Sequence, residues 1–514
     1  MIGNWKRNLN YMISRLLVYL FLSIFMVPSA FSQVYQGARY EKVLDREDDD
    51  FLIVSADENG LFLSRMVKNK ETKRDFKYEL IHLDTALQVK WELFDYVDLE
   101  YKKVGYDFID PYVYFLFRSS LKTKRFKVIR FEKETQAKEV FDFETEYDLE
   151  MTEFEVIDET LIFGGYVNNR PTFVCYKFGS ATPIVLPGFR NEPNQIMQLE
   201  VEEKKGIFNV LLNHQTPDKK RSISLRTFDT NGNLLIDYDL QPQGDYGLIY
   251  GRSVAINEER HIVVGTYSHK KSDLSRGIFV STIESNGDHV INYYNYADLK
   301  NFFNYLKAKR EIRIKKKIAR RKIKGKKNKF HYKLLVHDII EYKDQYIMVG
   351  EAFYPKYSYT SPGYATYNPY YTGGSFFEGY AYTHAVVIGF DHRGKILWDN
   401  SFEIQDIVTF NLRHYVHAGP VDDGIVLLYV YNNEIRMKII QGTQVLDIQD
   451  QIELKTNLDK ELIDEDDVNS EYGGLEDWYG KTYFAFGIQE IKDSESMIGA
   501  EKTDIFFINK VILK

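Results

Sequence analysis

The segment between Lys307 and Lys329 concentrates positive charge. It holds 14 lysine or arginine residues and one acid, Glu311, so it carries +13, whereas the whole chain carries −8 and the remainder −21. Such an array binds anionic groups on acidic proteins, anionic membranes or nucleic acids. The candidate binding residues in this segment are Lys315, Lys316, Lys317, Arg320 and Arg321.

The same segment has the pattern of a helix. Asp298 is a candidate N-cap, and Gly325 stands near the expected end. Four apolar residues before the basic run fall on one helical face: Leu299, Phe302, Phe303 and Leu306. We predict a basic helical insertion over 299–332 that docks on an acidic envelope protein, on the acidic remainder of the chain or on an anionic membrane surface. Nucleic acid is not expected, because few aromatic residues are interleaved for stacking.

A second unusual segment, from Phe353 to Tyr382, holds nine tyrosines and three phenylalanines, with Lys356 and Glu378 as its charges. Its prolines and glycines predict a long loop without regular structure over 355–383. Tyrosine offers a large amphipathic contact area, which suits a protein partner, a sugar ring or a cover over the fold. The candidate partner-binding residues here are Tyr364, Tyr367, Tyr370 and Tyr371.

Common signatures of catalytic and cofactor sites are absent from the sequence, including His-Glu-x-x-His, Cys-x-x-Cys, Gly-x-Ser-x-Gly and the Gly-rich phosphate loop. His414 and His417 point to opposite faces of a predicted strand, which disfavours a metal site. The run 229–233 superficially resembles a calcium loop and is better explained as a hairpin turn. The acidic run 464–467 indicates a solvated loop that could bind calcium weakly or receive the basic segment. We therefore name no catalytic residue, metal ligand or cofactor.

The N-terminus has the order of a secretory signal peptide. Lys6, Arg7 and Arg15 precede an apolar run over 16–27, and Ala-Phe-Ser ends at Ser32. Twelve residues fall short of the roughly 20 that span a bilayer, so we predict a cleaved signal over 1–32. No cysteine lies near the cut, so a lipoprotein anchor is not expected. The protein is predicted to be extracytoplasmic, that is periplasmic, outer-membrane associated or secreted.

One supersecondary unit recurs eight times along the chain. In each unit a charged or turn-forming pair precedes an apolar run of strand length, as in Asp110-Pro111 before 112–117. A second hairpin usually follows, with turns such as 228–233 and 390–394, so each unit contains four strands. The residues at the centres of the apolar runs are Ile53, Phe115, Phe163, Asn209, Val263, Met348, Leu427 and Ala485.

The spacing of these units predicts an all-β fold. Five spacings lie between 46 and 62 residues, and two longer ones, of 85 and 79, contain the basic and tyrosine-rich segments. A period near 50 with four strands is typical of a propeller blade, which stacks on its neighbours. We predict a β-propeller of seven or eight four-stranded blades over 33–514, with eight favoured by the count. Two stacked β-sandwiches are the alternative, because they also use short strands.

Two units share a sequence motif. Asp84 is followed by Trp91, and Asp391 by Gly394 and Trp398. These stretches, 83–91 and 390–398, resemble the blades of quinoprotein-like propellers. The resemblance implies a quinone cofactor where the pattern is complete and an envelope scaffold where it is degenerate. The other units depart from the pattern and the chain has only 4 tryptophans, so the degenerate kind is the better comparison and no cofactor is predicted.

These observations favour a non-enzymatic interaction or scaffold protein of the bacterial envelope over an enzyme. The alternative is a glycan-binding or glycan-active protein that uses the funnel at the centre of the propeller. The two differ in what they require, since an enzyme needs a central pocket with clustered, perturbed acids or metal ligands, whereas a scaffold needs a large apolar and aromatic patch.

Overall fold

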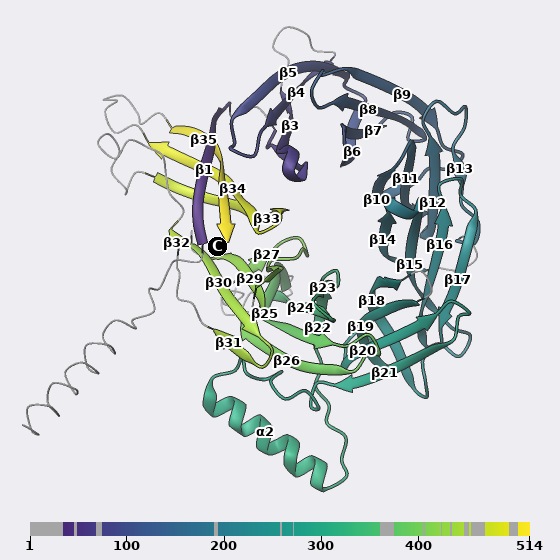
Figure 1. The fold of residues 1–514 in the computed structure, drawn as a ribbon, viewed down its shortest axis with the longest axis vertical. Coiled ribbons are helices and arrows are strands. Elements are labelled where there is room, and N and C mark those ends of the chain that lie inside the picture. Colours follow the sequence, from purple (N-terminus) through teal and green to yellow (C-terminus); the bar gives the residue numbers. More distant parts are fainter. Residues whose placement is uncertain are drawn as a thin grey trace, which may run out of the picture.

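The computed structural model is an eight-bladed β-propeller (Figure 1). It describes residues 34–45, 49–67, 75–189, 194–257, 260–270, 272–359, 375–404, 407–422, 424–431, 434–446, 452–453, 468–492 and 502–513. The predicted signal peptide, the acidic run 464–467 and the four candidate tyrosines of the 355–383 segment lie outside these residues. Among the described helices, none is long and apolar enough to cross a bilayer.

The first four blades are antiparallel sheets with strands in sequence order, the first strand lying nearest the central opening. Blade 1 contains β2 (Leu52–Ser55), β3 (Leu61–Val67), β4 (Asp75–Leu83) and β5 (Val89–Asp98). Blade 2 contains β6 (Tyr101–Ile109), β7 (Tyr112–Ser119), β8 (Arg125–Glu132) and β9 (Lys138–Glu144). Blade 3 contains β10 (Glu150–Ile157), β11 (Thr160–Val167), β12 (Arg170–Lys177) and β13 (Ile184–Val185). Blade 4 contains β14 (Gln195–Glu202), β15 (Ile207–Gln215), β16 (Arg221–Asp229) and β17 (Leu234–Leu240).

The remaining blades carry the additions to the ring. Blade 5 contains β18 (Tyr246–Asn257), β19 (Arg260–His269), β20 (Gly277–Glu284) and β21 (His289–Asn295). Blade 6 contains β22 (Lys333–Val336), β24 (Gln345–Tyr359), β25 (Ser375–Phe390) and β26 (Ile396–Glu403), with the short β23 (Ile340–Tyr342) and β27 (Val408–Thr409) beside them. Blade 7 contains β28 (His417–Val421), β29 (Gly424–Tyr431), β30 (Glu434–Gln441), β31 (Gln444–Leu446) and β32 (Ile452–Glu453). Blade 8 contains β33 (Val468–Tyr479), β34 (Thr482–Lys492), β35 (Lys502–Leu513) and, from the other end of the chain, β1 (Val34–Leu44). Two 3-10 turns, η1 (Asp57–Asn59) and η2 (Glu203–Lys205), join strands of blades 1 and 4, and the helix α2 (Ala308–Ile323) precedes blade 6.

The pairing of β1 with β35 closes the ring. The two strands are antiparallel, from Val34 opposite Leu513 to Leu44 opposite Asp504, so the N-terminal strand completes the last blade. The prediction of four-stranded blades is confirmed, the count is eight, and the sandwich alternative is wrong. One of the eight predicted central residues lies on a different strand of its blade from the others. Ile53 lies on β2, the first strand of blade 1, whereas the other seven lie on the second strands of their blades.

Apolar clusters between neighbouring blades hold the ring together. In the described residues there are eight such clusters, one at each interface, because both faces of every sheet are apolar. The interface of blades 8 and 1 packs Trp478 and Phe506 against Leu61 and Phe51. Cys175 is buried at the interface of blades 3 and 4, where burial raises the pKa of its thiol to about 12, so it serves as a small apolar residue.

The turn between the third and fourth strands recurs with the same hydrogen bonds. The Asp229 carboxylate accepts from the backbone N–H groups of Asn231 at 2.9 Å and Asn233 at 2.8 Å, and Gly232 supplies the required positive φ of 80°. Asp84 and Asp391 accept from the equivalent N–H groups of their own turns. The hairpin interpretation of 229–233 is therefore confirmed.

The helical insertion is shorter than predicted. Asp298 is not its N-cap: α2 follows Lys307, and 299–306 form turns instead of helix. The reason lies in blade 6, where the Asp399 carboxylate accepts from the N–H groups of Lys300 at 2.9 Å and Asn301 at 2.7 Å. These bonds satisfy donors that would otherwise open a helix. Gly325, with φ of 62°, follows the helix end as expected.

The tyrosine-rich segment is partly regular, which corrects the prediction of a loop without regular structure. Strands β24 and β25 extend into it as one long hairpin, with Pro355 opposite Tyr380 and Tyr359 opposite Ser375. Register shifts at Ala352/Phe353 and Lys356/Tyr357 flank the proline, which lacks a donor for the ladder.

Removal of β1 tests the closure. A chain that begins at residue 45 should lose the outer strand of blade 8 and unfold at a lower temperature, by roughly 5 °C or more, because a few kcal/mol of packing and hydrogen bonding are lost. A synthetic peptide of residues 34–44 should restore part of the stability in differential scanning calorimetry, whereas a scrambled peptide should not. Equal melting temperatures with and without β1 would contradict closure by this strand.

Candidate functional site

The helix α2 lies on the outer rim of the ring, beside blades 5 and 6 (Figure 1). Its inner face carries Ile314 and Ile318, which pack into the cluster between these blades. The turns before it contribute Leu299, Phe302 and Phe303, all buried in the same cluster. The helix is therefore held against the rigid ring by apolar packing on one face.

The opposite face of α2 carries a shallow basic depression of about 610 Å³, which we call the outer hollow. Eight of its nine lining residues are basic: Lys309, Arg313, Lys316, Lys317, Arg320, Arg321, Lys324 and Lys326. In the described part of the chain, none of these eight forms an ion pair with a carboxylate. Uncompensated cations at helical spacing create a strong local positive potential.

The five basic residues predicted from the sequence divide into two groups. Lys316, Lys317 and Arg320 are exposed and line the outer hollow. Lys315 is instead paired with Glu311 at 2.6 Å, and Arg321 is half-buried and donates to the carbonyl of Lys327 at 2.6 Å. The first three are therefore the ones free to meet a partner.

A larger depression of about 1230 Å³, the hairpin hollow, lies between the start of α2 and the base of the β24–β25 hairpin. Lys307 and Arg310 line it from the helix side, and Tyr354 lines it from β24. Tyr305 and Tyr332 also line it, with their hydroxyl groups 3.0 Å apart. The two unusual segments of the sequence thus contribute to one surface.

A buried histidine supports this hollow. His384 on β25 stacks on Tyr305, with ring centroids 3.7 Å apart and an interplanar angle of 1°. Burial lowers the pKa of His384 to about 3, so its ring is neutral at physiological pH. Thr383 contacts its Nδ1 at 2.9 Å. The histidine therefore positions Tyr305 and does not add charge to the surface.

Exposed aromatic side chains continue along the hairpin. Tyr354 and Tyr357 are about half exposed, and Phe377 packs on Tyr357 with centroids 5.6 Å apart. Phe410, beyond β27, is 76% exposed. The described part of the tyrosine-rich segment therefore has several exposed aromatic side chains.

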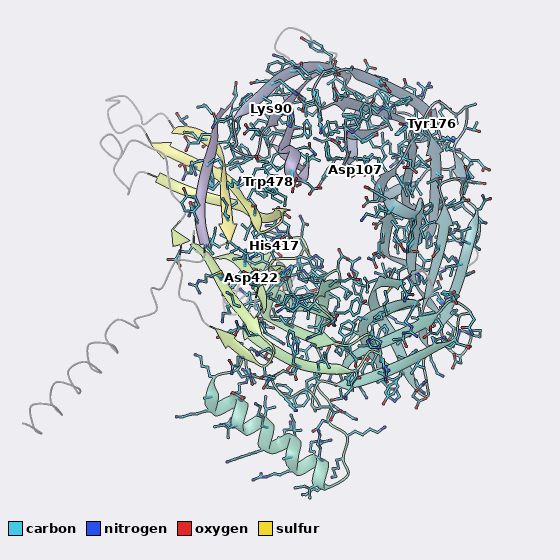
Figure 2. The ribbon with its side chains drawn as sticks, viewed as in Figure 1. Lys90, Asp107, Tyr176, His417, Asp422 and Trp478 are labelled. Carbon is cyan, nitrogen blue, oxygen red and sulfur yellow. The ribbon has the colours of Figure 1, made fainter. Side chains whose placement is uncertain are left out.

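The central channel carries a second candidate site, in which most of the charged lining residues are acidic. A depression of about 460 Å³ is lined by Asp107, Glu155 and Glu200 from the first strands of blades 2, 3 and 4, and Asp107 lies on the inner side of the ring (Figure 2). Burial is the largest cause of a raised pKa in all three carboxyls. The pKa is raised to about 6 for Asp107, to about 8 for Glu155 and to about 7 for Glu200. Neighbouring carboxylates add to the shift of Glu155, with Asp107 the largest contributor.

The histidines near the channel have separate partners. His414 lies before β28 and not in a strand, so the strand prediction was wrong there, and it stacks on His337 with centroids 4.0 Å apart. His417 begins β28 and lies 3.3 Å from Asp477. The buried Glu351 accepts from His337 at 2.7 Å. Among the described residues, no group of three His, Cys, Asp or Glu side chains is arranged to hold a metal ion.

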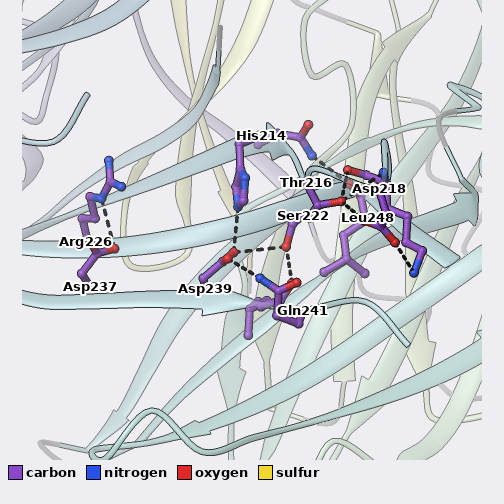
Figure 3. A network of polar contacts seen from close by, with 12 residues as sticks. His214, Thr216, Asp218, Ser222, Arg226, Asp237, Asp239, Gln241 and Leu248 are labelled. Atoms are coloured by element: carbon purple, nitrogen blue, oxygen red, sulfur yellow. Dashed lines mark hydrogen bonds and ion pairs between the residues drawn. The ribbon is translucent and has the colours of Figure 1, made fainter. Parts of the chain in front are cut away.

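A serine, a histidine and an aspartate also meet on blade 4 (Figure 3). His214 Nε2 lies 2.7 Å from Asp239, and Ser222 Oγ lies 3.2 Å from the same carboxylate oxygen. Ser222 is buried and also donates to the carbonyl of Leu240. A nucleophilic triad requires the histidine to accept the serine proton. Here both side chains bond to the carboxylate instead, so the network ties strands together.

No family model and no curated protein matches the sequence. Among solved structures, the chain is similar to the quinohemoprotein alcohol dehydrogenase ADHIIG from Pseudomonas putida HK5, with 9% identity, a TM-score of 0.42 and coverage of 94% of this chain and 76% of that one. A europium-containing methanol dehydrogenase gives 8% identity, a TM-score of 0.41 and coverage of 91% and 93%. The polysaccharide lyase Uly1 gives 8% identity, a TM-score of 0.38 and coverage of 80% and 90%. The class of protein is defined by the sheet topology, and it is an eight-bladed β-propeller.

The channel carboxyls predict a specific pH dependence of stability. The pKa of Glu155 is raised to about 8, above the roughly 4.3 of an unfolded chain, so the native state binds this proton more tightly and loses stability as pH rises between these values. Glu155→Gln should therefore gain melting temperature relative to the parent at pH 8 more than at pH 5. Glu150→Gln, at an exposed position of the same strand β10, is the control. An equal effect of Glu155→Gln at both pH values would contradict the assignment.

Proposed function

We propose that this β-propeller is an extracytoplasmic, non-enzymatic interaction protein of the bacterial envelope, and that it binds an acidic partner through the outer hollow of α2. One observation carries the proposal. Among the described residues, eight cations without carboxylate partners line the outer hollow, six of them on a helix that is anchored to the ring and two just beyond its end. The signal-like pattern over 1–32 supports the location.

The direction of the charged face supports an external partner. The rest of the chain is acidic, with a net charge of −21, and an unanchored basic helix would be attracted to that surface. Apolar packing of Ile314 and Ile318 instead orients the helix with its cations outward. A fixed helix also loses less conformational entropy on binding than a mobile one.

The same packing favours an acidic macromolecule over a membrane surface. A helix that lies on a membrane inserts an apolar stripe below the headgroups. In α2 that stripe, Ile314 and Ile318, is occupied by the propeller core. Only Ile312 and Ile323 remain as exposed large apolar side chains on the described helix, at 53% and 86% exposure.

The glycan-active alternative is favoured by one observation, the raised pKa of the three channel carboxyls. Release of reducing ends from an acidic polysaccharide by the parent protein, and its loss in Glu155→Gln, would support that function. Equal background release by both proteins would leave the channel without a catalytic role.

Charge reversal on the helix tests the proposed function. The triple variant Lys316→Glu, Lys317→Glu, Arg320→Glu should lose partner binding by about tenfold or more at low ionic strength, because attraction becomes repulsion. Affinity purification after cross-linking in the native envelope, followed by titration of the recovered partner, measures this loss.

The matched control reverses Lys102, Lys122 and Lys204, which are exposed on blades 2 and 4. This control should bind like the parent protein. Equal loss in both triple variants would show a general charge effect, and unchanged binding in the helix variant would refute docking through the outer hollow.

A further inference from the structure

The outer hollow continues into a depression at each end of α2. It shares Lys309 and Arg313 with the hairpin hollow. At the other end it shares Lys326 with a third depression of about 1030 Å³, the blade-5 hollow. The shared lining residues therefore place the three depressions in a row along the helix, and we call this row the path. The helix has 16 residues and so a length of roughly 24 Å.

Aromatic rings stand at the blade-5 end of the path. Tyr246, Tyr267 and Tyr293 line the blade-5 hollow and contact one another, with ring centroids 4.6 to 5.1 Å apart. Tyr267 is buried beneath the other two, so the partly exposed Tyr246 and Tyr293 are the rings that a ligand can reach. Arg276 lines the same hollow. The nearby Asp298 is already paired with Lys322 at 2.8 Å, so its negative charge is compensated.

Aromatic rings also stand at the hairpin end. Tyr305 and Tyr332 line the hairpin hollow, and Tyr354 is 51% exposed there. Lys307 and Arg310 line the same depression. The order along the path is therefore aromatic rings with cations, then the outer hollow with eight cations and Ile312, then aromatic rings with cations again. Acidic residues line only the two ends: Asp245 and Asp298 in the blade-5 hollow, and Glu403 in the hairpin hollow.

From this order we infer that the path binds a linear acidic polysaccharide, one that carries carboxylate or sulfate groups along its length. This inference rests on the proposed function and names the chemical class of the partner. Tyrosine faces offer amphipathic surfaces against which sugar rings pack, and lysine and arginine pair with the acid groups. An acidic polypeptide would use the cations in the same way but has no sugar rings to place on the tyrosines.

The test uses the chain from residue 33 onward and three polymers: polygalacturonic acid, poly-L-glutamate and neutral dextran. The parent should bind polygalacturonic acid more tightly than poly-L-glutamate and should not bind dextran, as measured by isothermal titration calorimetry at low ionic strength. The double variant Tyr246→Leu, Tyr354→Leu should weaken binding of polygalacturonic acid about tenfold and leave poly-L-glutamate binding unchanged.

Two controls isolate the aromatic contribution. The double variant Tyr246→Phe, Tyr354→Phe keeps both rings and should recover the affinity that the leucine variant loses. Tyr96→Leu changes an exposed tyrosine of blade 1, far from α2, and should bind like the parent. If the double leucine variant does not fold, Tyr354→Leu alone replaces it, because this side chain is half exposed.

The outcomes separate this inference from the proposed function. If the leucine variant binds polygalacturonic acid like the parent, or loses both polyanions equally, the polysaccharide inference is wrong while docking on α2 stands. If the helix charge-reversal variant retains both polyanions, the proposed function itself fails.

Discussion

The packing of apolar sheet faces against one another is the constraint on which the whole structure depends. Each blade has two apolar faces, and a neighbouring blade covers each of them at one of the eight interfaces described above. A row of such sheets would leave an apolar face bare at each end, which water disfavours. In a closed ring every blade has a neighbour on both faces, so no apolar face is left bare. Strand β1 completes the ring by pairing with β35.

This closure decides where a partner can bind. With the sheet faces covered, the free surfaces are the channel, the loops and the rim. The insertion before blade 6 uses the same interface packing as an anchor, because Phe302 and Ile318 join the cluster between blades 5 and 6. The cations of α2 are then held outward at fixed spacing. The ring thus provides a rigid support, and the insertion provides the cationic side chains that would bind a partner.

The features that could be predicted are those that depend on residues close together in the sequence. Apolar runs at a period near 50 define strands locally, so the blades and their number could be counted. The start of the helix depends on Asp399, which lies about 100 residues from the N–H groups that it accepts, and no local pattern contains it. The extra cations Lys309, Arg313 and Lys324 do follow helical spacing and were predictable in principle. Tyr246 and Tyr354 lie far apart in the sequence, and only the fold places one at each end of the same helix.

The central claim is that the rim around α2, and not the channel, is the binding surface. Hydrogen–deuterium exchange of the chain with and without polygalacturonic acid tests it most directly. The account predicts protection of residues 305–332 and of the base of the β24–β25 hairpin, with unchanged exchange on β6, β10 and β14. Protection confined to those three channel strands would contradict it.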